Sequence, residues 1–216
     1  MLGWINYILL TLTLAFVVWL HVSMIMGRKQ SSAKKIADIV NEESAANFAR
    51  RRPIPDDFYF TPDISDLPMK EYADAKSKVA IKQVRALKLA NAKMIRLPRT
   101  MTNLEIKMEY GPANLETVTN GEEIYQAFLE SLIAWADALS DERENEDAKK
   151  ILEKSIDLGC DVSRCFLSLA KLYAEDHDKT AIEKLMNRLD IGELIPKNEA
   201  IRKKTVAEIR KMYNNI

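Results

Sequence analysis

Two residues with side chains capable of covalent chemistry fall in the C-terminal half of the chain. Cys165 is a possible thiol nucleophile, and His177 is the only histidine outside the apolar N-terminal segment. A thiol in the first turn of a helix has a lowered pKa, and a histidine can act as its base. The pair predicts, as an alternative function, a thiol-dependent or regulatory enzyme. Burial as a small hydrophobic side chain is the commoner fate of such a cysteine.

Other catalytic or ligand-binding patterns are missing from the sequence. The 6 glycines are spread along the chain and form no phosphate-binding loop. Asp176-His177-Asp178 is too short to hold a metal ion without further ligands. The 2 cysteines make no disulfide framework, which indicates a reducing compartment. We therefore expect a non-enzymatic protein with no catalytic residue, no metal and no cofactor.

The N-terminal segment, residues 1–27, is apolar and carries no charged side chain. A helix over residues 4–26 would be about 34 Å long, enough to cross a hydrocarbon core of ~30 Å. The sequence thus predicts a transmembrane anchor whose partner is the lipid bilayer. Four basic residues follow it: Arg28, Lys29, Lys34 and Lys35. By the positive-inside rule they predict a single-pass protein of the cell membrane with the bulk of the chain in the cytoplasm.

A basic juxtamembrane helix is expected over residues 28–52, ending in Arg50, Arg51 and Arg52. Together with the basic residues next to the anchor, these arginines would meet anionic lipid, at roughly 1 kcal/mol for each nearby charge. An organiser of an anionic lipid surface is therefore a further alternative function.

Residues 53–68 hold four prolines, which exclude a regular helix, and three adjacent aromatic residues. Leaving the aromatic side chains in water would expose apolar area, and a proline-rich segment loses little entropy when it docks. We expect an ordered strap along the protein's own helices; a partner-binding motif is the alternative. The residues expected to pack are Phe58, Tyr59, Phe60, Ile64 and Leu67.

The charges balance overall, with 32 basic and 32 acidic residues, but they are unevenly distributed. Residues 76–110 carry nine basic and two acidic side chains, whereas residues 111–178 carry six and sixteen. We expect the basic face of the first segment to pair with the acidic body. Since no aromatic residues are interleaved with the basic ones, we do not expect a nucleic-acid partner.

The remaining residues, 69–216, predict a helical domain. Met69 to Arg96 contains neither Gly nor Pro and predicts one long helix that stops before Pro98. Thr102-x-x-Glu105 has the pattern of a capping box, although alternating apolar residues leave a strand open over residues 102–110. A second such pattern, Thr119-x-x-Glu122, predicts the start of a stronger helix.

The C-terminal third aligns with itself at an offset of 34 residues. Trp135, Ala136 and Leu139 fall on Leu169, Ala170 and Tyr173, and both copies are interrupted by polar runs. A small residue beside large ones is what two closely crossing helices require. The sequence predicts helical hairpins at about 129–162 and 163–196, with a capping helix over 198–214.

This pattern resembles the tetratricopeptide repeat. The residues that match its 34-residue unit are Trp135, Ala136, Ala148, Ala170 and Tyr173. Ile182 replaces an expected small residue, and Pro196 comes two positions late. The resemblance implies a protein-binding groove lined by the first helix of each hairpin. In this register the groove residues are Ile133, Asp137, Leu167 and Lys171.

Asp137 stands where relatives that clamp a terminal carboxylate have an asparagine, so no such clamp is expected. The four groove residues can instead simply pack against neighbouring helices. The sequence as a whole predicts an all-α fold with a single N-terminal transmembrane helix followed by a tetratricopeptide-like domain. The predicted function is a membrane-anchored, cytoplasm-facing protein-binding scaffold or adaptor with a protein or peptide partner.

Overall fold

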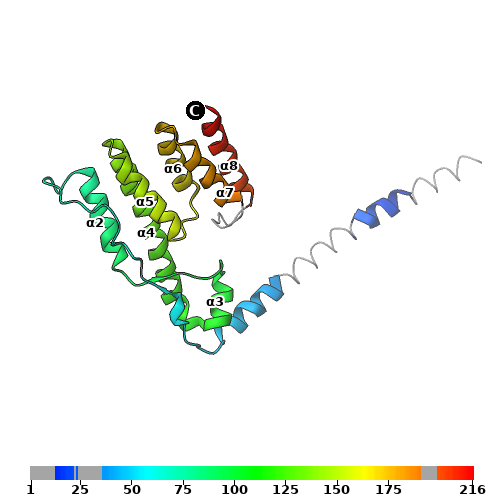
Figure 1. The fold of residues 1–216 in the computed structure, drawn as a ribbon. Coiled ribbons are helices and arrows are strands. Elements are labelled where there is room, and N and C mark those ends of the chain that lie inside the picture. The colour runs from blue at the N-terminus through cyan, green and yellow to red at the C-terminus, as the bar shows by residue number, and fades with distance from the viewer. Residues whose placement is uncertain (1–12, 22, 24–35, 191–198) are drawn as a thin grey trace, which may run out of the picture. The chain divides into compact units, whose positions relative to one another are not determined.

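The computed structural model describes residues 13–21, 23, 36–190 and 199–216 (Figure 1). The chain divides into two compact units. Unit 1 comprises Met1–Ile54 and Thr100–Glu116, and unit 2 comprises Pro55–Arg99 and Thr117–Ile216.

Among the described residues, no helix is both long enough and apolar enough to cross a membrane. Of the predicted span 4–26, the structure describes residues 13–21 and 23, which are helical. The absence of a spanning helix among the described residues contradicts the predicted transmembrane anchor and the predicted single-pass localisation, and we retain neither. Four basic residues beside the span lie outside the described residues: Arg28, Lys29, Lys34 and Lys35.

In unit 1, residues 36–47 are helical, and α3 (Asn103–Tyr110) is followed by a short 3-10 turn, η2 (Pro112–Asn114). The capping box at the start of α3 is present, because Thr102 caps the Glu105 amide and the Glu105 side chain accepts from the Thr102 backbone. Residues 102–110 are therefore a helix and not a strand.

The three arginines of unit 1 lie beside the end of α3. The Arg52 amide donates to the Tyr110 carbonyl at 3.1 Å, and Asn114 Nδ2 donates to the Arg52 carbonyl at 2.6 Å. Gly111, at φ 86°, permits this approach, since a Cβ there would lie 2.7 Å from Arg51 Cα. The backbone of Arg50–Arg52 is thus fixed while its side chains are exposed.

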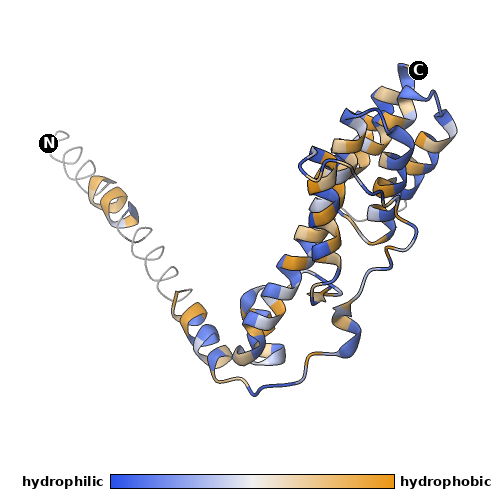
Figure 2. Ribbon diagram, turned by 90° about the vertical axis from the view of Figure 1, so that its left-hand side faces the viewer, coloured by the Kyte–Doolittle hydropathy of each residue, from blue (hydrophilic) through white to orange (hydrophobic). Residues whose placement is uncertain are grey.

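Unit 2 is mostly helical, with consecutive helices side by side (Figure 1). The helices are α2 (Lys78–Ala90), α4 (Leu115–Asp141, whose first two residues belong to unit 1), α5 (Asn145–Asp157), α6 (Ser163–Glu175), α7 (Lys179–Asp190) and α8 (Glu199–Asn214). Helix α6 packs against α5 and α7, and α8 packs against both α6 and α7. In Figure 2, apolar and polar residues alternate along these helices, as amphipathic helices require.

The two hairpins, α4–α5 and α6–α7, turn in the same way. Arg143 and His177 both have left-handed backbone conformations, with φ 64° and φ 57°. The amide after each of them, in Glu144 and Asp178, donates at 2.9 Å to a carbonyl five residues earlier. All these positions are 34 residues apart, so the backbone repeats the offset seen in the sequence.

The repeated apolar positions form the core of unit 2. Trp135, Ala136 and Ala170 are fully buried, and Leu169 is 2% exposed. The second helices contribute equivalent pairs, which are also buried: Ile151 and Leu152 in α5, Leu185 and Met186 in α7. The fold is therefore compatible with a helical repeat.

Some of the expected elements are wrong. The predicted helix Met69–Arg96 is shortened to α2, because Ser77 caps the Ala80 amide and starts the helix there. Met94–Ile95 forms a strand, β2, that pairs antiparallel with β1 (Tyr59–Phe60), which an all-α prediction did not include. Helix α4 begins at Leu115, before the expected cap at Thr119.

The two left-handed turns give a stability prediction. Replacing Arg143 or His177 by Gly relieves the steric cost of a Cβ in this region, so each change should raise the free energy of unfolding by about 0.5–1 kcal/mol. Urea denaturation of the full-length protein measures this. The control is Lys150→Gly, at an exposed position inside α5, which should lower the free energy of unfolding by about 1 kcal/mol. Equal destabilisation by all three changes would contradict the prediction.

Candidate functional site

The first helices of the two hairpins each carry an equivalent row of residues at helical spacing. The row on α4 is Glu130, Ile133, Ala134 and Asp137, and the row on α6 is Arg164, Leu167, Ser168 and Lys171. Each residue of the second row lies 34 positions after its counterpart. We call the surface formed by these two rows the α4/α6 face.

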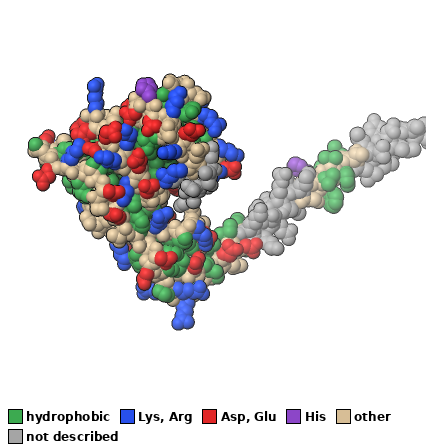
Figure 3. All heavy atoms as spheres, in the orientation of Figure 1, with side chains coloured by type: hydrophobic (Ala, Val, Ile, Leu, Met, Phe, Trp, Pro, Cys, Tyr) green, Lys and Arg blue, Asp and Glu red, His purple; other side chains and the backbone are tan. Residues whose placement is uncertain are grey.

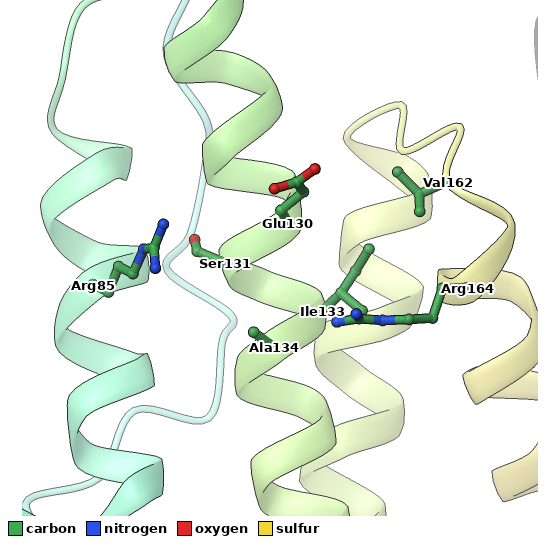
Figure 4. Close-up of a pocket in the computed structure, with 7 residues that line it drawn as sticks. All are labelled: Arg85, Glu130, Ser131, Ile133, Ala134, Val162 and Arg164. Carbon is green, nitrogen blue, oxygen red and sulfur yellow. The ribbon is translucent and has the colours of Figure 1, made fainter.

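Two depressions mark this face. One, of about 320 Å³, is lined by Arg85, Glu130, Ser131, Ile133, Ala134, Val162 and Arg164. The other, of about 380 Å³, is lined by Lys78, Ala136, Asp137, Ser140, Asp141, Leu152, Ser168, Lys171 and Leu172. Figure 4 shows the first depression, with the guanidinium groups of Arg85 and Arg164 pointing toward α4 from α2 and α6. Helix α2 thus adds a wall to the surface made by the repeat.

Ion pairs join the helices across the α4/α6 face. Arg164 Nη2 lies 3.0 Å from Asp137 Oδ2, and Ser168 Oγ donates to Asp137 Oδ1 at 3.4 Å. Lys78 of α2 pairs with Asp141 of α4, and this carboxylate raises the pKa of the lysine. Figure 3 shows acidic and basic side chains intermingled on the face in view. The surface offers mixed charge and hydrogen-bonding groups around two small hollows, an arrangement that suits a partner of mixed charge better than a polyanion.

The structure places the four predicted groove residues differently. Asp137 and Lys171 line the same depression, whereas Ile133 is 1% exposed and forms the floor of the other. Leu167 is half-buried against the core and lines neither. Sequence reasoning missed Arg164 and Ser168, which the helical spacing of the α6 row would have identified.

The possible thiol–histidine pair is not assembled. Cys165 is fully buried, and its thiol donates to the Leu152 carbonyl at 3.7 Å. A hydrogen bond with Cys160, together with burial, raises the pKa of the Cys165 thiol. His177 lies exposed beyond the other end of α6, and Cys165 and Glu175 alone are about 15 Å apart along the helix, ten residue steps of 1.5 Å. The geometry therefore does not support the thiol-dependent alternative.

In the part of the chain that the structure describes, no three or more His, Cys, Asp or Glu side chains are grouped so as to hold a metal ion. The Asp176-His177-Asp178 turn is instead an α6–α7 connection in which Asp178 Oδ1 accepts from the Ala181 amide. That carboxylate caps α7.

The proline-rich segment lies against unit 2. Phe58 and Leu67 are buried at 9% and 7% exposure, and Phe60 and Ile64 pack against the core. The Phe60 ring meets Tyr125 edge-on, with centroids 5.3 Å apart. Further contacts fix the segment from outside: Lys93 over the Tyr59 ring, Arg96 over the Phe60 ring and Lys154 to Asp66 at 2.8 Å.

Comparisons with known proteins do not add to this description. No family model, no curated protein and no solved structure matches the chain.

Burial of both thiols predicts their reactivity. Cys160 and Cys165 should stay unmodified by iodoacetamide at neutral pH in the folded full-length protein and react fully after denaturation. Mass spectrometry of the intact chain counts the adducts. A thiol that reacts at the rate of free cysteine without denaturant would contradict the buried arrangement.

Packing of the proline-rich segment predicts its resistance to proteolysis. Chymotrypsin, which cleaves after aromatic residues, should spare Phe58–Phe60 in the folded protein. Phe48, which is 87% exposed, is an internal control and should be cleaved first. Peptide mapping over time measures both sites. Early cleavage between Phe58 and Phe60 would show that the segment does not pack as described.

Proposed function

We propose that this protein is a non-enzymatic scaffold or adaptor whose tetratricopeptide-like helical domain binds a protein segment on the α4/α6 face. The observation that supports the proposal most strongly is the pair of equivalent rows on α4 and α6, in register at an offset of 34 residues. These rows line two neighbouring depressions.

The dimensions and chemistry of the face also support a peptide ligand. Depressions of about 320 and 380 Å³ each have room for a side chain or two of a bound segment. Ile133 offers an apolar floor, while Asp137, Ser168 and Lys171 offer polar groups at the rim. An extended segment with alternating apolar and polar side chains would use both.

The proposed likeness to the tetratricopeptide repeat is supported by the repeat length, the small residues at Ala136 and Ala170, and the left-handed turn after each first helix. In this family the first helices line the binding surface, which is the arrangement proposed here for α4 and α6. Ion pairing of Asp137 with Arg164 argues against a clamp for a terminal carboxylate at this position.

A peptide library displayed on phage tests the proposal. Selection on the full-length protein should enrich peptides whose affinity falls by about tenfold when Lys171→Glu reverses one charge on the α4/α6 face, or ~1.4 kcal/mol. Lys171 is well exposed, with 70% of its side chain in solvent, so the change should leave the fold intact. Fluorescence anisotropy of the synthesised peptide measures the affinity.

The matched control is Lys204→Glu on α8, which is exposed and outside the face. It should bind the peptide as the unmodified protein does. Failure to enrich any peptide, or an enriched peptide that ignores Lys171→Glu, would overturn the proposed binding surface.

A further inference from the structure

The outward side of α2 carries exposed apolar residues beside basic ones. Ile81 is 53% exposed and Val84 is 63% exposed, three positions apart and therefore on one side of the helix. Arg85 and Lys88 are exposed and continue the same row. We call these four residues the basic stripe.

An acidic hollow lies on the N-terminal half of α4. A depression of about 360 Å³ is lined by Thr119, Glu122, Glu123, Gln126, Ala127 and Glu130. Glu122, Glu123 and Glu130 share this lining with Ala127 and Gln126. The hollow therefore combines negative charge with space for an apolar side chain.

The basic stripe and the acidic hollow are adjacent parts of one surface of unit 2. Glu130 borders the acidic hollow and also lines the depression that Arg85 lines. In Figure 4, Arg85 points from α2 toward α4, the helix that carries Glu130. One half of this continuous surface is basic and the other half is acidic.

The charges of this surface remain unpaired within the described residues. Among the residues that the structure describes, no ion pair joins Arg85 or Lys88 to a carboxylate, and none joins Glu122, Glu123 or Glu130 to a base. Elsewhere in unit 2 comparable charges do pair: Lys70 with Glu144 and Asp147, Lys154 with Asp66, Arg164 with Asp137 and Arg188 with Asp157. The surface thus keeps both signs of charge available for another molecule.

We propose that this surface is an isologous interface through which two copies of the chain associate. A two-fold axis near Arg85 and Glu130 lays the basic stripe of one copy on the acidic hollow of the other, and the reverse contact occurs at the same time. Ile81 and Val84 then enter the hollow beside Ala127. The inference goes beyond the proposed peptide binding: the two surfaces share Glu130 and the depression that Arg85 lines, whereas Asp137, Ser168 and Lys171 of the α4/α6 face lie outside this interface.

Charge complementarity favours a second copy over other occupants. A polyanion would meet the carboxylates of α4, and a basic partner would meet the cations of α2, so each would be repelled by half of the surface. A second copy related by a two-fold axis places opposite charges against both halves, and each favourable contact occurs twice.

Charge reversal on the full-length protein tests the interface by sedimentation equilibrium. The stripe variant, Arg85→Glu with Lys88→Glu, and the hollow variant, Glu122→Lys with Glu123→Lys, should each weaken self-association by tenfold or more, since like charges then face each other. An equimolar mixture of the two variants should restore association, because the stripe of each now matches the hollow of the other.

Lys204→Glu with Lys211→Glu, two exposed positions on α8, is the matched control and should leave self-association unchanged. The proposal is overturned if the unmodified protein is monomeric, if the stripe and hollow variants associate as strongly as the control, or if their mixture fails to recover. The Lys171→Glu protein should still associate. A variant that loses peptide binding but still self-associates counts against neither interface as such. Together with a variant that loses self-association but still binds the peptide, it distinguishes the two proposals.

Discussion

The arrangement of unit 2 depends on close packing at two alanines, Ala136 and Ala170. Both are fully buried and stand at the same position of the two hairpins. A methyl group lets a neighbouring helix approach, while Trp135 and Leu169 beside them fill the remaining space. A larger side chain at either alanine would cost about 1–3 kcal/mol in strain. The close packing at these alanines determines which side of each first helix faces the core. It therefore also determines which residues of α4 and α6 lie on the surface.

The sequence predicted the hairpins better than it predicted their surroundings. Apolar spacing and an internal repeat located the turns near Arg143 and His177, although neither turn carries the glycine that a left-handed residue favours. The absence of Gly and Pro predicted a single helix over Met69–Arg96, and this prediction was wrong. Ser77 starts α2 later, and Met94–Ile95 pairs with a distant strand. Such pairing depends on residues far apart in the chain, which local spacing does not report.

The candidate site was accessible to sequence reasoning only in part. The helical period and the 34-residue repeat place Asp137 and Lys171 at equivalent positions of α4 and α6, so their common face could be predicted from the sequence. It does not show that Arg164 reaches Asp137, since that contact depends on the distance between α4 and α6 and on side-chain length. The contribution of α2 was equally hidden, because α2 lies outside the repeat and enters the face only through packing of the chain.

The expected pairing of residues 76–110 with the acidic body occurs at the start of α2 through Lys78 and Asp141, and Lys70, which precedes that segment, adds to it. Lys70 binds Glu144 and Asp147, and this lysine holds the pKa of the Asp147 carboxyl below its ordinary value. The stabilisation is therefore present above the unfolded-state pKa and is lost as pH falls through the lower folded-state value.

Lys78 uses the carboxylate of Asp141 at the same end. These pairs involve the last residue of α4, the turn after it and the start of α5. Asp141 lies about 27 Å along α4 from Glu123, a distance of 18 helical residues. The later basic residues of α2 and the earlier acidic residues of α4 are left over by this arrangement. The segment before α2 and the start of α2 contact the C-terminal end of α4. For this reason the carboxylates at that end are paired, and Glu122 and Glu123 are not paired within the described residues.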